Sequence, residues 1–439
     1  MLAALAVAAL GIAVLAGMRG GPIHVSWAGA IGASTALDLD PLSALFVALT
    51  GIVFAAGALA SERVGHRRAY FALWDLLLAA LVATFVARDL LLFFVFWDAA
   101  LVPIALLIWQ WGDRDRRAAT QRLLFHALAG SALLLVGIIS LAVARGTLDI
   151  DALAARRVPG SAQLFPAMLI LAGLAVRLPV FPLHGWLPRA VASAPVPVSI
   201  AIVAAMSASA VYATMRIPLY LFPDGMTTAA PLLGALAAVG AVYGAVVATR
   251  ETDIRRMLAF AAMAQANIVA LGIFAANETS LRGAIFASVS NGLAIAAALV
   301  IAGAIARRTS SFSLAGAGGL AATAPCLAAC FTIASFALVG VPGTSGFVGT
   351  LLALIGAYER VPASTAVASL FWIVSAVWAL AALRRVFHGP PLARGADLRA
   401  IEAVILVPIL ALVIGLGVLP RVLNDRIPDG ALPSAELVR

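Results

Sequence analysis

The stretch LLLFFVFWDAALVPI at residues 90–104 decides the class of this protein, because one carboxylate, Asp98, stands in an otherwise apolar run. The same character extends along the chain. Of its 439 residues, 63% are hydrophobic and 11% are charged, with a mean hydropathy of +1.07. Soluble domains are close to half apolar and a quarter charged, so the composition excludes a soluble protein. It also excludes a disordered chain, and two cysteines exclude a disulfide scaffold.

Many apolar runs are long enough to cross a bilayer, whose core of about 30 Å needs about 20 helical residues. The sequence predicts an all-α integral membrane protein, one polytopic domain over residues 1–439 with about 13 transmembrane helices. We expect the first run to be a retained helix, because it lacks the basic start of a signal peptide. The predicted spans are 1–17, 42–60, 70–87, 90–110, 121–143, 164–182, 196–215, 229–248, 257–275, 283–305, 325–357, 363–383 and 401–419.

Two of these spans contain helix breaks. The sixth ends in LPVFP (178–182), with Pro179 and Pro182, and the eleventh contains VPGTSG (341–346), with Pro342 and Gly343. Such backbone survives at membrane depth only where protein or water satisfies its polar groups. Because the breaks lie five spans apart, we expect two repeated bundles, each with an interrupted helix. The expected parts are a first half bundle at 40–248, a second at 249–390 and a last helix at 401–423.

The basic residues predict the orientation. All 29 are arginine, with 17 in loops after even-numbered spans, counting Arg122 at the edge of the fifth span, and 8 in loops after odd-numbered spans. By the positive-inside rule the even loops are cytoplasmic. We therefore expect a multi-pass protein of the inner (plasma) membrane, with its N-terminus cytoplasmic and its C-terminus external. The net charge of +9 then needs no nucleic-acid partner, since short arginine clusters suit topology and lipid headgroups.

Four ionisable residues are predicted to lie well within spans: Asp75, Asp98, His126 and Arg177. A charge near the bilayer centre costs about 2.5–3.5 kcal/mol, so such residues are usually paired or functional. Asp75 fits an interfacial residue, and His126 fits a hydrogen-bonded packing residue better than a relay. Asp98 and Arg177 fit two roles equally, a structural ion pair between helices or a switchable pair in a proton pathway.

Nothing in the sequence indicates catalysis or a bound cofactor. No cluster of Cys and His has metal-ligand spacing. The run GAGG at 316–319 follows a predicted span and not a strand, so it does not indicate a dinucleotide fold. We expect no catalytic redox centre, no cofactor and no metal site in this chain.

Five motifs follow one another in the order and spacing of a known family: LLLFFVFWDAALVPI (90–104), FPLHGWLPRA (181–190), ETDIRRMLAF (251–260), GVPGTSGFVG (340–349) and GVLP (417–420). The chain resembles the antiporter-like membrane subunits of respiratory complex I, most closely NADH-quinone oxidoreductase subunit M, the mitochondrial subunit 4 class. Related chains occur in membrane-bound hydrogenases and multisubunit cation/proton antiporters. The family usually has fourteen spans, so the resemblance implies that the first is missing here, which agrees with the arginine-based orientation.

The resemblance also implies a polar axis at mid-membrane along which protons move. The family's glutamate after the aromatic run corresponds to Asp98, and its lysine before the first break corresponds to Arg177. The lysine on the next span corresponds to Ala208. The two histidines and the further charged residue of the axis correspond to Gln265, Asn291 and Thr350.

These replacements differ in their chemistry. Asp98 still titrates, whereas Arg177 carries a guanidinium, which cannot release a proton in a working cycle. The three rear residues can hydrogen-bond and orient water but cannot store charge. The front half therefore keeps an ion pair, and the rear half has no titratable residue on the axis. The proton-path candidates are Asp98, Arg177, Asn291, Thr350, Gln265 and His126.

Three functions are compatible with these features. The resemblance implies a membrane subunit of a proton-translocating NADH-quinone oxidoreductase-like complex. Paralogous antiporter-like subunits would then lie beside it, and partner subunits would hold NADH, FMN, iron–sulfur clusters and quinone. The depleted axis alternatively fits a non-pumping structural or assembly paralogue in a complex I-, hydrogenase- or antiporter-type assembly. The third hypothesis is a stand-alone secondary transporter with its site at the broken helices.

Overall fold

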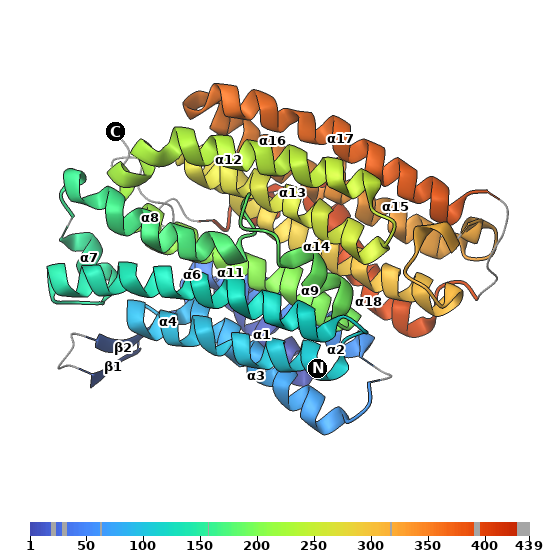
Figure 1. Cartoon of the computed structure of the whole chain (residues 1–439), viewed down its shortest axis with the longest axis horizontal. Coiled ribbons are helices and arrows are strands. Elements are labelled where there is room, and N and C mark those ends of the chain that lie inside the picture. Colours follow the sequence, from blue (N-terminus) through green and yellow to red (C-terminus); the bar gives the residue numbers. More distant parts are fainter. Residues whose placement is uncertain are drawn as a thin grey trace.

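The structure is a computed structural model that describes residues 1–18, 23–28, 33–61, 64–156, 158–316, 318–389 and 396–427. Its long helices lie side by side, with the first half of the chain in the lower part of Figure 1 and most of the second half above it. The elements are α1 (Leu2–Leu15), β1 (Ile23–Ala28), β2 (Ala33–Leu37), α2 (Pro41–Ala60), α3 (Arg67–Val86), α4 (Leu90–Ala99), α5 (Leu101–Trp111), α6 (Arg116–Arg145), α7 (Ile150–Ala155), α8 (Gly160–Arg177), α9 (Leu187–Ser193), α10 (Val196–Ile200), η2 (Ala201–Met206), α11 (Ser207–Thr214), η3 (Met215–Leu219), α12 (Pro223–Arg250), α13 (Ile254–Ala275), α14 (Glu278–Thr309), η4 (Leu314–Gly316), η5 (Leu320–Ala322), α15 (Pro325–Val339), α16 (Ser345–Arg360), α17 (Pro362–Phe387), α18 (Ala400–Val418) and α19 (Arg421–Asn424).

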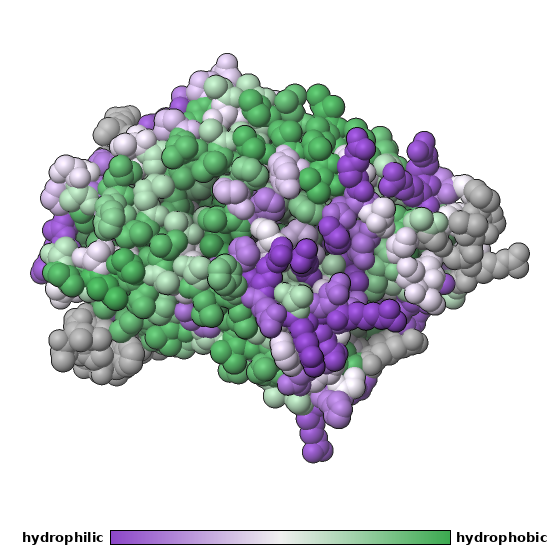
Figure 2. Space-filling view, in the orientation of Figure 1, coloured by the Kyte–Doolittle hydropathy of each residue, from purple (hydrophilic) through white to green (hydrophobic). Residues whose placement is uncertain are grey.

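The predicted membrane spans are confirmed. Eleven helices in the described residues are long and apolar enough to cross a membrane, and α1 and α15 are shorter apolar helices. Each of the thirteen predicted runs coincides with a helix or with consecutive helical pieces. Figure 2 shows hydrophobic side chains over the flank of the bundle and hydrophilic side chains gathered towards one end. A broad apolar flank is what a bilayer requires of a spanning protein.

Several helices are longer than their apolar runs. The run 121–143 lies in α6, which begins at Arg116, and the run 283–305 lies in α14, which begins at Glu278. An apolar run marks only the part of a helix that lies in the hydrocarbon core of the membrane. The helix itself can begin earlier, and α14 begins where a capping box forms between Asn277 and Ser280. A small antiparallel hairpin, β1 with β2, joins α1 to α2.

The seventh span is not a regular α-helix. Two π-helical segments, η2 and η3, flank the short α11. A π-helical turn is wider than an α-helical turn and is often found at functional sites. The positions Ser207 and Ala208 follow directly after the first wide turn.

The boundary between the two half bundles at residues 248 and 249 stays a prediction. The helix α12, which ends the first half, packs against both α13 and α17 of the second half. The orientation in the membrane also stays a prediction, and the chain's C-terminal end, residues 428–439, lies outside the described residues.

Candidate functional site

The structure brings Asp98 of α4 and Arg177 of α8 together. Arg177 is 2% exposed, and its Nη2 lies 3.6 Å from Asp98 Oδ1. The same Nη2 donates to the Trp97 carbonyl at 2.5 Å, and the guanidinium lies 3.8 Å from the centroid of the Trp97 ring. Asp98 accepts a hydrogen bond from the Ser131 hydroxyl at 2.5 Å. The backbone and ring of Trp97 therefore hold the cation, and a serine holds the carboxylate.

A one-residue interruption at Ala100 separates α4 from α5, two residues after Asp98. The Asp89 side chain caps α4 by accepting from the backbone of Leu91 and Leu92. The helix then ends at Ala99, and α5 contains Pro103. Proline has no N–H to donate and clashes with the carbonyl four residues earlier, which belongs to Ala99. The proline thus accounts for an interruption of the helix within one turn of Asp98.

Both prolines predicted to break the first interrupted helix lie between α8 and α9. Asn267 of α13 satisfies the freed backbone there. Its Nδ2 donates to the Pro179 carbonyl at 3.2 Å, and its Oδ1 accepts from Phe181 N at 3.3 Å. The Trp186 indole donates to the Val176 carbonyl at 2.8 Å. Protein groups therefore meet the requirement that a helix break at membrane depth imposes.

The second break separates α15 from α16. Gly340 and Gly343 have φ angles of 83° and 90°, which glycine adopts without steric cost, and Pro342 lies between them. Gln265 of α13 donates from Nε2 to the Leu338 carbonyl at 2.6 Å. A side-chain amide from the same helix therefore holds each of the two breaks.

Gln265 and Asn267 stand two residues apart on α13, a span whose apolar window is entirely buried. Residues two apart point to nearly opposite sides of an α-helix, so one helix between the breaks can hold both. Thr350 of α16 donates to Gln265 Oε1 at the long distance of 3.5 Å. This rear cluster, Gln265 and Thr350, contains no charge.

The other predicted residues lie apart from the ion pair. His126 is half-buried on α6, and its Nδ1 donates to the Arg122 carbonyl at 2.8 Å. None of the hydrogen bonds and ion pairs described joins His126 to Asp98. Asp75 is exposed on α3, eight residues after the start of that helix, and its interfacial position stays a prediction. Asn291 of α14 is half-buried, and its Oδ1 has no hydrogen-bond partner among the described residues.

Asn267, Ser131 and the role of Trp97 were not predicted from the sequence. Asn267 lies two residues from Gln265, and Trp97 is the neighbour of Asp98, so both were close to positions already named. Nothing in the sequence distinguishes Ser131 from other serines in apolar runs.

Two further clusters of buried charges were not among the ionisable residues predicted to lie within spans. The first joins Asp40, which caps α2 through Ser43 N, with Arg216 and Arg88. Burial raises the pKa of Asp40, but the guanidinium groups of Arg216 and Arg88 outweigh it and hold the pKa below the usual 3.8. Arg216 was missed because it lies one residue beyond the predicted end of its span.

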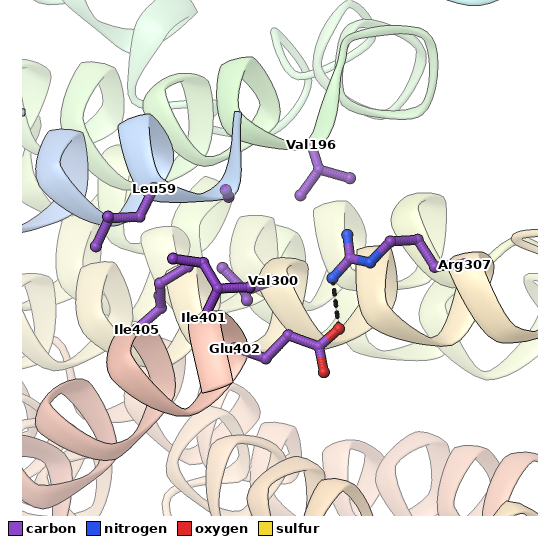
Figure 3. A pocket seen from close by; sticks show the side chains of 8 residues that line it. Leu59, Val196, Val300, Arg307, Ile401, Glu402 and Ile405 are labelled. Carbon is purple, nitrogen blue, oxygen red and sulfur yellow. Dashed lines mark hydrogen bonds and ion pairs between the residues drawn. The ribbon is translucent and has the colours of Figure 1, made fainter. Parts of the chain in front are cut away.

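The second cluster lies at the start of α18. Glu402 is 1% exposed and accepts from Arg307 at 2.8 Å (Figure 3). It also accepts from Arg308 at 2.9 Å. Leu59 and Val196 line the same small cavity as Glu402 and Arg307. Glu402 is the second residue of the predicted span 401–419, so it was not among the charges predicted to lie well within a span. The pair joins α18 to α14, and removing one partner would leave a buried charge.

Known proteins resemble this chain in sequence along most of its length. The model of a family described as NADH:quinone oxidoreductase/Mrp antiporter, transmembrane, matches residues 87–376. NAD(P)H-quinone oxidoreductase chain 4 1 of Synechococcus sp. (strain JA-3-3Ab) is 34% identical over 414 residues, which cover 90% of this chain and 78% of the relative. NADH-quinone oxidoreductase subunit M of Rhodobacter capsulatus is 32% identical over 409 residues, covering 89% and 80%.

Solved structures share the fold along the whole chain. A chain of respiratory complex I from Thermus thermophilus superposes with a TM-score of 0.91 and 30% identity, covering 100% of this chain and 94% of that chain. A chain of the Mrp complex from Dietzia sp. DQ12-45-1b has a TM-score of 0.88 at 23% identity, covering 100% and 91%. The second likeness concerns the fold alone.

Proposed function

We propose that Asp98 and Arg177 form the proton-conducting centre of this chain. The chain belongs to the family of membrane subunits shared by NADH:quinone oxidoreductases and Mrp antiporters. It is a membrane subunit of a proton-translocating complex, as its relatives are. We further propose that this complex reduces quinone. NADH, FMN, iron–sulfur clusters and quinone then belong to partner subunits, and paralogous antiporter-like subunits lie beside this chain in the plasma membrane.

The observation that carries the proposal is the Asp98–Arg177 pair next to a helix break. A permanently charged guanidinium is buried at membrane depth with a carboxylate 3.6 Å away. The carboxylate side chain is 27% exposed, whereas the guanidinium side chain is 2% exposed. Asp98 is therefore the member of the pair that can exchange a proton with its surroundings.

The contacts of Arg177 allow such an exchange without moving the cation. Its Nη2 already donates to the Trp97 carbonyl, and its guanidinium lies over the Trp97 ring. A proton on Asp98 cancels the attraction between the two side chains while these contacts with Trp97 persist. The hydroxyl of Ser131 then keeps the carboxyl in place, since a hydroxyl both donates and accepts.

The substitution Asp98→Asn in the assembled complex tests the proposal. The amide keeps the size of the side chain and cannot take up a proton, so we expect proton translocation per electron to fall by about tenfold or more. Asp98→Glu, which keeps the carboxyl, is the matched control and should retain translocation. Both variants are measured in proteoliposomes, alongside the amount of assembled complex.

The neutral rear cluster favours one alternative, a subunit that supports assembly and does not conduct. In that case Asp98→Asn would leave translocation per electron unchanged, and deletion of the chain would disrupt the complex. Ion exchange by the purified chain alone in liposomes would contradict both functions and favour a stand-alone transporter.

A further inference from the structure

A wide depression opens on the surface where the loop between α5 and α6 meets α9 and α13. It has a volume of about 1020 Å³ and is lined by residues 112–117, by 192 and 193 at the end of α9, and by 253, 255 and 256 at the start of α13. Figure 2 shows hydrophilic side chains gathered over the area in which Figure 1 labels α9. Five of the lining residues are arginines and three are aspartates, so the lining carries an excess of positive charge. The depression therefore suits an anion.

The excess positive charge gathers on one side of the depression. Arg255, on the α13 side, pairs with Asp113 at 2.8 Å. Its neighbour Arg256 pairs with Glu251 at 2.9 Å. On the α6 side, three arginines form no ion pair with any residue that the structure describes: Arg114, Arg116 and Arg117. An anion therefore finds uncompensated guanidinium groups beside the start of α6.

The start of α6 adds backbone donors to these side chains. No side chain caps this helix, since Asp115 at its N-cap accepts no hydrogen bond from the first turn. The backbone N–H groups of Arg117 and Ala118 have no hydrogen-bond partner among the described residues. Such N–H groups and the helix dipole favour an anion at this end of a helix. The start of α13 differs, because the Asp253 side chain already caps it.

Arg255 supplies a buried donor to the lining. Its side chain is 8% exposed, and its Nη1 donates to Asp113 Oδ2 at 2.8 Å. The guanidinium also lies 3.6 Å from the centroid of the Phe312 ring, so it is held from two sides. The Nε of Arg255 is buried and has no hydrogen-bond partner among the described residues. A buried donor without a partner is unfavourable, and an acceptor oxygen bound in the depression would satisfy it.

An apolar helix face leads to these arginines. On α5, Val102, Leu106 and Trp109 are exposed by 58%, 37% and 41%, and their spacing of four and three residues places them on one face. The face ends at Arg117, whose guanidinium carbon lies 5.7 Å from the centroid of the Trp109 ring. Tryptophan is enriched where a membrane meets water. A soluble anion would use the arginines alone, whereas a phospholipid would use the arginines and the apolar face together.

We propose that the depression binds an anionic phospholipid of the phosphatidylglycerol class. Its phosphate accepts hydrogen bonds from Arg114, Arg117 and the first turn of α6, since a guanidinium can donate two parallel hydrogen bonds to a phosphate. A headgroup oxygen accepts from Arg255 Nε, and an acyl chain lies along the exposed face of α5. The carboxylate of Asp115 repels the phosphate, but the arginines outnumber it. This site does not depend on whether Asp98 conducts protons.

The test titrates the assembled, delipidated complex with a photo-crosslinking phosphatidylglycerol and quantifies labelling of α5 and α6. Joint substitution Arg114→Gln and Arg117→Gln should weaken binding by about tenfold or more, because each arginine near the surface contributes to the attraction of an anionic lipid. Asp115→Asn removes the repelling charge and should strengthen binding. Arg385→Gln, which removes an exposed arginine at the end of α17, is the control and should bind like the wild type. The amount of assembled complex is measured for each variant.

Four outcomes would overturn the site. The first is equal labelling by the phosphatidylglycerol probe and a phosphatidylcholine probe, and the second is unchanged labelling in the double variant. The third is competition by water-soluble glycerol phosphate as strong as that by unlabelled phosphatidylglycerol, which would favour a soluble phosphate compound. The fourth is an electron-microscopy map of the complex in phosphatidylglycerol nanodiscs with a protein segment in the depression. We expect that map to show headgroup density beside Arg114 and Arg117, which the double variant lacks.

Discussion

The two interrupted helices of this protein have similar supports and different chemistry. In the front half, the break follows Arg177, a buried cation paired with Asp98. In the rear half, the break is surrounded by neutral groups, Gln265 and Thr350. Amides on one helix, α13, hold both breaks, so the scaffold is alike on the two sides. In this fold, an interrupted helix can therefore occur without a titratable group beside it.

Substitution of Arg177 should have the largest effect. Arg177→Met removes the charge that pairs with Asp98 and the side-chain donor to the Trp97 carbonyl, so we expect loss of translocation. Removing one partner of a buried pair costs about 3–5 kcal/mol, and the partial exposure of Asp98 lowers that figure. Arg177→Lys keeps a positive charge and should retain assembly. Thermal denaturation and proton translocation of both variants check this prediction. Full translocation by Arg177→Met would show that the front half, like the rear half, works without a buried charge.

The Asp40 cluster separates a structural ion pair from a conducting one. Asp40→Asn leaves the buried Arg216 short of its carboxylate, so we expect a loss of about 3 kcal/mol of stability with translocation per electron unchanged. The pKa of Asp40 lies below 3.8 in the folded protein, so its contribution is fully present above that pH. It is lost as the pH falls from 3.8 through the folded pKa.

The pH dependence of thermal stability checks this sign. The stability difference between wild type and Asp40→Asn should be constant between neutral pH and pH 5 and should shrink only below 3.8. A difference that shrinks between pH 7 and pH 5 would show that Asp40 is not held ionised by its arginines.

The two amides of α13 should differ in the size of their effects. Asn267→Leu leaves the Pro179 carbonyl and Phe181 N without their side-chain partner. Gln265→Leu leaves the Leu338 carbonyl without its partner and removes only the long contact with Thr350 besides. Each unsatisfied buried group costs about 1–3 kcal/mol, so the front variant should denature at the lower temperature. A lower denaturation temperature for Gln265→Leu than for Asn267→Leu would mean that the rear break depends more on its amide than these contacts indicate.

Thr350→Val should have the smallest effect. Its hydroxyl donates at 3.5 Å, the outer limit of a hydrogen bond, and valine has nearly the same shape. We expect a change in stability within about 0.5 kcal/mol and unchanged translocation. A large loss of translocation would instead make Thr350 a rear relay and weaken the contrast between the halves.

The sequence predicts which segments span the membrane better than it predicts which side chains contact one another. The thirteen spans and both helix breaks follow from apolar runs interrupted by proline and glycine, and the structure has all of them. The roles of Gln265 and Asn267 do not follow from any pattern. Because α13 is buried on all sides, it has no polar face, and hydropathy says nothing about which way each amide points.

The charges show the same limit. Asp98 and Arg177 stand out because each is deep in an apolar run. Glu402 and Arg216 stand at the ends of their spans, where a buried and an exposed charge have the same sequence context. Their burial depends on neighbours from other helices, Arg308 for Glu402 and Asp40 for Arg216.

Infrared difference spectroscopy of the assembled complex tests directly whether Asp98 takes up and releases a proton during turnover. We expect a carboxylic acid band that appears and disappears with turnover in the wild type, persists at a shifted position in Asp98→Glu and is missing in Asp98→Asn. The same band in Asp98→Asn as in the wild type would show that another group carries the proton and would leave the Asp98–Arg177 pair with a structural role.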